Sequence, residues 1–356
     1  MNSSERIKTV LRGEIPDRIP ICEVSFWPKT IERWKKEGLP ENTDPIYYLG
    51  MDRIRFLYYK RGFYFEKKIL GENEEQIIYI DEYGKKMIDW KPTSKNFGIP
   101  HVIQHSLSNK SDWERMEVYL KPEEKRIPDG FYQDYLEGRK NGDFIALTIE
   151  EPAWFILEQT FGFENGLPLF IQEKDLVLEI MEKVVNFNIE MCDLVLNKGI
   201  KPDCLWMWSD LCYKNGMLFS PKIFREIVMP FHKKIVEFCK DNDLFLILHC
   251  DGYVRELIPL LIEEGIDAIQ PLEGRCGNDV REYKKLFGDK ITLFGNISTE
   301  ILSSDKEKIK KEIEEKVKVA KENGRYIFHS DHSIPNTVSF ENYRYAIELA
   351  KETGSY

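Results

Sequence analysis

The chain has 356 residues, of which 42% are hydrophobic and 31% charged, a composition typical of a globular protein with a large core. Its net charge of −10 argues against nucleic acid as a partner, and no apolar run approaches the roughly 18 residues that a membrane span needs. The seven scattered cysteines do not resemble a disulfide framework. Together with the lack of a recognisable signal peptide, they predict a cytoplasmic protein.

Short apolar segments recur along the chain, and most are bounded by Gly, Pro, Asp or Asn. Such runs are typical of parallel strands that are buried on both faces. We expect eight of them: 19–24, 53–58, 144–149, 204–208, 244–248, 268–271, 292–295 and 326–328.

Helical segments separate most of these strands. They are expected at 28–37, 176–197, 220–239, 254–264, 279–287, 304–323 and 340–352. Ser220-Pro221 is a good helix start, and Gly324 is a suitable residue to follow a helix end. Eight strand–helix units with right-handed crossovers predict one α/β domain over residues 1–356, a (β/α)8 TIM barrel.

One segment interrupts this rhythm. Residues 64–90 alternate and contain turn signals, which predicts a small antiparallel β excursion in the N-terminal third of the chain. Residues 91–142 look irregular, with one helix near 111–119. Because the segment 64–142 follows the second strand, we expect it to form an insertion that partly covers the carboxyl end of the barrel.

The expected strand ends are unusually polar. In this fold the active site lies where the strands end, so these side chains are candidates for one shared site, although polar residues are also common where loops begin. The candidates are Glu23, Glu150, Glu151, Asp210, His249, Asp251, Gln270, Glu273, Asn296, His329, Asp331 and His332. Among them, Glu23, Gln270, Asn296 and His329 are expected to contact a substrate.

A metal site is the sharpest of these hypotheses. His249 and Asp251 are two residues apart at a strand end and should point to the same side, and His332 comes from the last strand-to-helix loop. Nitrogen and oxygen ligands of this kind suit zinc, with an open position for a substrate. Alternatively, His249 could bond to Asp210 or to a carbonyl group and position a substrate without metal.

Three further residues are candidates for catalysis. Asp210 could orient a histidine or act as a general base, and at least one of Glu150 and Glu151 should face the barrel mouth. Nearby Trp154 could form a wall for an aromatic or methylated substrate, or it could simply pack in the core.

These motifs together resemble the uroporphyrinogen decarboxylase superfamily over most of the chain. The resemblance rests on Pro16-Asp17-Arg18-Ile19-Pro20, Ser209-Asp210, Ser220-Pro221-Lys222-Ile223-Phe224, His249-Cys250-Asp251-Gly252 and His332-Ser333-Ile334-Pro335. True decarboxylases of this superfamily carry arginines that hold substrate carboxylates in a segment that here reads Glu23-Val24-Ser25-Phe26-Trp27-Pro28. That segment has no arginine, so the chain looks closer to the corrinoid-dependent methyltransferases.

The resemblance implies a zinc-dependent methyltransferase. Its metal ligands would be His249, Asp251 and His332, because Asp251 takes the second position of the His-x-Cys pair and His332 that of a later cysteine. Such hard ligands suit an O-methyl donor better than a thiol. The expected partners are a small methyl donor and a corrinoid protein, and a homo-oligomer is possible. The alternatives are a cofactor-free carboxy-lyase acting on a small carboxylate and a non-catalytic barrel that binds a cofactor.

Overall fold

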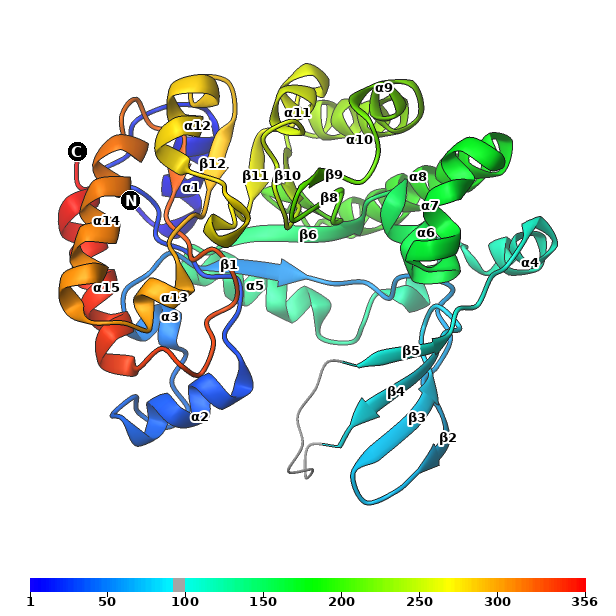
Figure 1. Ribbon diagram of the computed structural model, residues 1–356, viewed down its shortest axis with the longest axis horizontal. Coiled ribbons are helices and arrows are strands. Elements are labelled where there is room, and N and C mark those ends of the chain that lie inside the picture. The colour runs from blue at the N-terminus through cyan, green and yellow to red at the C-terminus, as the bar shows by residue number, and fades with distance from the viewer. Residues whose placement is uncertain (92–99) are drawn as a thin grey trace.

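The computed structural model describes residues 1–91 and 100–356, and within them a parallel β-barrel forms the body of the protein (Figure 1). Seven parallel strands pair in the order β1-β6-β7-β10-β11-β12-β13. Their bounds are Ile54–Leu57, Phe144–Glu150, Cys204–Trp208, Phe245–His249, Ala268–Gln270, Thr292–Phe294 and Tyr326–Ile327. The predicted α/β TIM barrel is confirmed, and these strands match seven of the eight that the sequence predicts.

The predicted strand at 19–24 is the exception, because it is reduced to a single parallel bridge between Ile21 and Phe328. Pro20 has no N–H to donate, and the N–H of Ile21 bonds to the side chain of Asp52. The segment still closes the barrel. Cys22 donates to the carbonyl of Phe328 at 2.9 Å, and the N–H of Asp52 donates to the carbonyl of Ile21 at 2.7 Å.

Helices surround this sheet, as Figure 1 shows. In chain order they are α1 Ser3–Leu11, α2 Pro28–Lys36, α3 Pro45–Tyr48, α4 Lys110–Met116, α5 Phe131–Asn141, α6 Trp154–Phe161, α7 Phe163–Gln172, α8 Lys174–Asn197, α9 Pro221–Ile223, α10 Met229–Asp241, α11 Ile258–Glu264, α12 Val280–Phe287, α13 Thr299–Leu302, α14 Lys306–Ala320 and α15 Phe340–Gly354. None of the described helices is long and apolar enough to cross a membrane.

The helix expected at 220–239 is divided in the structure. Ser220 caps α9 as predicted, but a π-helical turn at Phe224–Val228 separates α9 from α10. Pro230 lies at the start of α10 and cannot donate the N–H that would continue a regular α-helix from the preceding turn. The sequence therefore predicts the helical segment correctly but not its break.

The antiparallel excursion is confirmed as a four-stranded sheet, β2 Lys68–Glu72, β3 Gln76–Ile80, β4 Lys86–Trp90 and β5 His101–Gln104. It projects from the barrel beside the chain that follows β1 (Figure 1). Residues 92–99 of the segment expected to be irregular lie outside the described residues. In the rest of 91–142 the helix expected near 111–119 is present as α4, but β5 and α5 add regular structure that was not expected. Gly130 and Gly142, which both have positive φ, flank α5 and mark its ends.

The interior of the barrel is a separate apolar layer. Its buried members include Ile54, Phe144, Trp206, Ile247 and Phe294, which come from five different strands. At the carboxyl end this layer finishes in aromatic rings that are only partly buried. Phe56 lies 5.0 Å from Trp206 and 6.0 Å from Trp208 between ring centroids. These rings form the floor beneath the polar strand ends.

Candidate functional site

His249 is held in one orientation at the end of β10. Its Nδ1 lies 2.7 Å from the side-chain oxygen of Gln270, which is buried on the neighbouring strand β11. The Trp208 ring packs against the imidazole, with 4.5 Å between ring centroids. Because the oxygen of Gln270 can only accept, the proton of a neutral imidazole lies on Nδ1. The lone pair of Nε2 is therefore free for another partner.

Two carboxylates face that nitrogen. Nε2 of His249 lies 3.8 Å from Asp210 and 3.9 Å from Oδ1 of Asp251, and ligand atoms of all three residues come within 4.8 Å of one another. The backbone N–H of Asp251 donates to Asp210 at 2.9 Å, which ties the two loops together. Oδ1 of Asp251 is buried and has no hydrogen-bond partner among the described residues. Burial raises the pKa of Asp251, although His249 opposes this.

Asp251 also belongs to a second set of possible ligands, with Glu273 and His332. Glu273 is the less available carboxylate, since its oxygens already accept from the N–H of Gly252 at 2.7 Å and from Arg275. The predicted ligands His249, Asp251 and His332 are thus divided between two overlapping sets that share Asp251. One set consists of His249, Asp251 and Asp210, and the other consists of His332, Asp251 and Glu273.

Glu150 reaches the same end of the barrel from β6. One of its oxygens accepts from the hydroxyl of Tyr83 and from the N–H of Gly62, which lie in the insertion and in the loop that leads to it. Its other oxygen is buried without a partner among the described residues. Burial raises the pKa of Glu150 more than the nearby charge of Arg61 lowers it. This carboxyl group therefore has unused hydrogen-bonding capacity.

Glu151 has a structural role, which corrects the expectation that it could be catalytic. Its two oxygens accept from the N–H groups of Ala153, Trp154 and Phe155 at the start of α6. It also contacts Nε2 of His232 at 2.8 Å, and neither side chain is exposed. Burial tends to raise the pKa of Glu151, but His232 and these N–H donors outweigh it and lower the pKa. Both oxygens of Glu151 therefore already accept hydrogen bonds from the start of α6.

Two residues expected to bind substrate are buried and make their contacts within the protein. Asn296 is fully buried, and its side chain accepts from the N–H of Val280 while donating to the carbonyl groups of Leu272 and Asn278. Trp154 is also fully buried and packs edge-on against Phe163, with 5.6 Å between ring centroids. Strand-end position alone therefore does not separate loop anchors from substrate contacts.

Glu23 and His329 form a buried pair rather than an open binding site. Nε2 of His329 lies 2.9 Å from Glu23, which also accepts from the hydroxyls of Ser330 and Tyr343. Burial tends to lower the pKa of His329, but the charge and hydrogen bond of Glu23, together with Ser330 and Asp331, outweigh it and raise the pKa. The pair links the first segment of the barrel to the last and so helps to close the barrel. Gln270, the fifth expected substrate contact, bonds to His249 and positions it.

Sequence reasoning missed three polar residues near this end of the barrel. His232 on α10 lies between Glu151 and Glu264, and these carboxylates outweigh burial and raise its pKa to about 10. Glu158 on α6 is partly buried, and burial together with Asp210 raises its pKa to about 7. Arg61 follows β1. These residues lie on helices or in a loop, away from the strand ends, so the pattern of polar strand ends does not reveal them.

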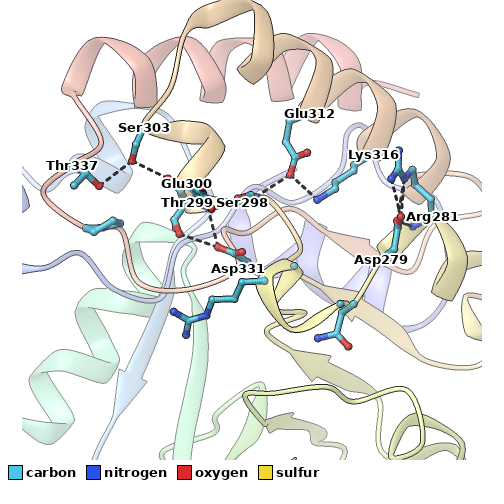
Figure 2. Close-up of a pocket in the computed structure, with 15 residues that line it drawn as sticks. Asp279, Arg281, Ser298, Thr299, Glu300, Ser303, Glu312, Lys316, Asp331 and Thr337 are labelled. Carbon is cyan, nitrogen blue, oxygen red and sulfur yellow. Dashed lines mark hydrogen bonds and ion pairs between the residues drawn. The ribbon is translucent and has the colours of Figure 1, made fainter. Parts of the chain in front are cut away.

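The barrel rim also carries a polar cavity of about 820 Å³ between the loops that follow β11, β12 and β13 (Figure 2). Its side chains mostly pair with one another. Asp331 accepts from the N–H and hydroxyl of Thr299, and Lys316 donates to Glu312 at 2.6 Å. Because most of its charged groups are already paired, this cavity offers a substrate fewer free groups than the His249 end of the rim does.

Comparison with known proteins agrees with this architecture. The model of the uroporphyrinogen decarboxylase family matches residues 153–353, which is more than half of the chain. The chain belongs to this family. The match includes Asp210, His249, Asp251 and His332 and excludes Glu150 and the insertion.

Individual relatives are more distant. A uroporphyrinogen decarboxylase of Hordeum vulgare is 32% identical over 136 residues, 37% of this chain and 39% of the relative. One from Hydrogenobaculum is 25% identical over 205 residues, 56% of this chain and 52% of the relative. The chain thus matches about half or less of these relatives. A methyltransferase from Methanosarcina mazei shares the fold over 99% of both chains, with a TM-score of 0.63 and 17% identity.

Proposed function

We propose that this protein is a methyltransferase that moves a methyl group from a small O-methyl donor to a corrinoid protein, with zinc bound at the His249 end of the barrel. The observation that carries the proposal is the fixed imidazole. Gln270 holds Nδ1 of His249, while Nε2 faces Asp210 and the unpaired oxygen of Asp251. The fold shared with the Methanosarcina mazei methyltransferase is consistent with this activity.

The residues present fit a zinc ion. A ligating histidine usually donates its other N–H to an acceptor, which is what Gln270 provides for His249. The unpaired Oδ1 of Asp251 would gain a partner on metal binding. We propose His249 and Asp251 as ligands, with Asp210 or His332 as the third, because each lies in a set with Asp251. Bound zinc would act as a Lewis acid on the ether oxygen of the donor.

The chain's own residues would place the donor. Trp208 packs on His249 and borders Phe56, so an apolar surface continues directly from the proposed ligands. Glu150 is the remaining candidate for handling a proton, because one of its oxygens has no partner and burial favours its protonated form. Glu151 is a weaker candidate for that role, because it bonds to the start of α6 and to His232.

A carboxy-lyase is the second candidate, favoured by the family match and by the names of the sequence relatives. In this chain, however, the segment 23–28 contains no arginine, and Glu23 within it is engaged by His329. A substrate with many carboxylates would therefore have few partners there.

The test is a methyl-transfer assay with zinc-loaded protein, an aryl or alkyl methyl ether, and reduced cobalamin as the acceptor. Appearance of the methylcobalamin spectrum in wild type, and its loss in Asp251→Asn, would support the proposal. Release of carbon dioxide from a small carboxylate, with no methylcobalamin from any ether, would instead establish the lyase.

A further inference from the structure

Arg61 is an arginine without a polar partner among the described residues. It lies in the loop after β1, and its guanidinium makes no hydrogen bond or ion pair with any residue in 1–91 or 100–356. The side chain is nonetheless partly buried. A guanidinium has five N–H donors that match a carboxylate well, so leaving all of them unpaired at a partly buried position is costly.

The surroundings of Arg61 show why it is left free. Its guanidinium lies 6.0 Å from the ring centroid of Tyr58 and 5.9 Å from that of Phe155, so two aromatic rings flank it. The charge of Glu150 acts on Arg61, but one oxygen of Glu150 accepts from Tyr83 and Gly62 rather than from the guanidinium. The arginine is thus flanked by rings, and it makes no hydrogen bond to Glu150, whose second oxygen has no partner among the described residues either.

Aromatic rings connect Arg61 to the proposed metal ligands. Tyr58 lies 6.1 Å from Phe56, Phe56 lies 6.0 Å from Trp208, and Trp208 lies 4.5 Å from His249, all between ring centroids. These residues are all at least partly exposed, in contrast to the buried Trp206 beneath them. The indole N–H of Trp208 is a further donor without a partner among the described residues.

This arrangement spans the mouth of the barrel. The strands run in the order β1-β6-β7-β10, so β1 and β10 are three strand spacings apart, roughly 14 Å between backbones. Arg61 follows the first of these strands and His249 ends the last. A ligand lying along the rings would therefore have one end at a cationic group and the other at the proposed metal ligands.

We infer that Arg61 binds the carboxylate of the methyl donor and that the donor is an aromatic methyl ether carrying that carboxylate. The inference rests on the proposed function and names its substrate class. The aromatic ring of the donor would lie on Phe56 and Trp208, with its methoxy group toward His249. The ether O–CH3 bond would break with its electron pair left on oxygen, which takes up a proton, the step proposed above for Glu150. The electron pair of cobalt(I) in the reduced corrinoid forms the new bond to the methyl carbon.

Charge-matched probes test this role. The three methoxybenzoates and the corresponding neutral methoxybenzamides have nearly the same shape, and their affinities for the zinc-loaded protein can be measured by calorimetry. Wild type should bind at least one benzoate about 10- to 100-fold more tightly than its amide, the range expected for hydrogen bonds to a charged group. Arg61→Gln should remove that preference, and Arg61→Lys should keep part of it. Arg225→Gln, at an exposed arginine on the π-helical turn, is the matched control and should behave as wild type.

The outcomes separate this inference from the function on which it rests. If wild type binds benzoate and amide equally, or if Arg61→Gln keeps the preference, the role of Arg61 is wrong, even if methyl transfer from neutral ethers is observed. If the preference depends on Arg61 but no ether yields methylcobalamin, anion binding at Arg61 stands and the methyltransferase assignment fails. Because the wild-type comparison needs no variant, misfolding of Arg61→Gln cannot rescue the inference.

Discussion

Replacing Gln270 with Met should weaken zinc binding without removing a ligand. In the native protein Gln270 accepts from Nδ1 of His249 at 2.7 Å, so the proton is kept away from Nε2. Without that acceptor, the proton would move to Nε2, where Asp210 and Asp251 lie 3.8 and 3.9 Å away and favour it. Zinc would then have to displace this proton before binding.

The expected loss follows from the buried bond. Gln270 is 2% exposed, so water cannot easily replace it, and leaving a buried donor unpaired costs about 1–3 kcal/mol. At about 1.4 kcal/mol for each factor of ten, zinc affinity should fall roughly 10- to 100-fold.

Competition with a chromophoric zinc chelator at neutral pH measures this loss. Gln270→Glu restores an acceptor at the same position and should retain binding close to wild type. Gln159→Met is a matched control, because that glutamine bonds Lys85 and contacts no proposed ligand. Zinc affinity of Gln270→Met within about threefold of wild type would refute the role given to Gln270, since the predicted range begins near tenfold.

Three further predictions concern the second carboxylate set, the buried His232 and the buried Trp154. Asp251→Asn should lower zinc content sharply, whereas Glu273→Gln should have a smaller effect because Glu273 is held by Gly252 and Arg275. Elemental analysis of both variants measures this, and a loss of zinc in Glu273→Gln as large as that in Asp251→Asn would place the metal in the second set, which contains both residues. The raised pKa of His232 stabilises the fold fully below about 6.5, and this contribution is lost as pH rises toward about 10. Urea unfolding of wild type should therefore show a loss of up to about 1.4 kcal/mol per pH unit in that window, and His232→Gln should lack this slope although it is less stable at pH 6. Trp154→Ala should lower the free energy of unfolding by about 3–5 kcal/mol while zinc affinity of the folded protein stays unchanged, and a selective loss of zinc would return Trp154 to the site.

The sequence predicts the barrel well because buried parallel strands have a strong local signal. Apolar runs such as Phe245–His249 end abruptly in polar residues, and the structure ends its strands there too. The prediction of a strand at 19–24 was wrong for a reason that is only partly visible in the local sequence. Pro20 is visible in the sequence, but the capture of the Ile21 N–H by Asp52 depends on a contact across 31 residues.

The candidate site is harder to predict, because strand-end position does not show which bonds a side chain makes. Glu151 and Asn296 both end strands, yet backbone groups of neighbouring loops consume their hydrogen bonds. Gln270 was expected to touch substrate and instead fixes a histidine on the next strand. Arg61 belongs to no recognisable sequence motif. Only the structure distinguishes it from a surface arginine, because it has no polar partner among the described residues and lies near two aromatic rings.

The central claim is that this barrel binds zinc and transfers a methyl group with it. The most direct measurement is zinc per chain in protein purified without added metal, made alongside methylcobalamin formation from a methyl ether in the same sample. We predict about one zinc per chain, with methylcobalamin formation lost when a chelator removes the zinc and restored when zinc is returned. Methyl transfer at full rate by protein that holds no metal would contradict the proposed role of His249 and Asp251.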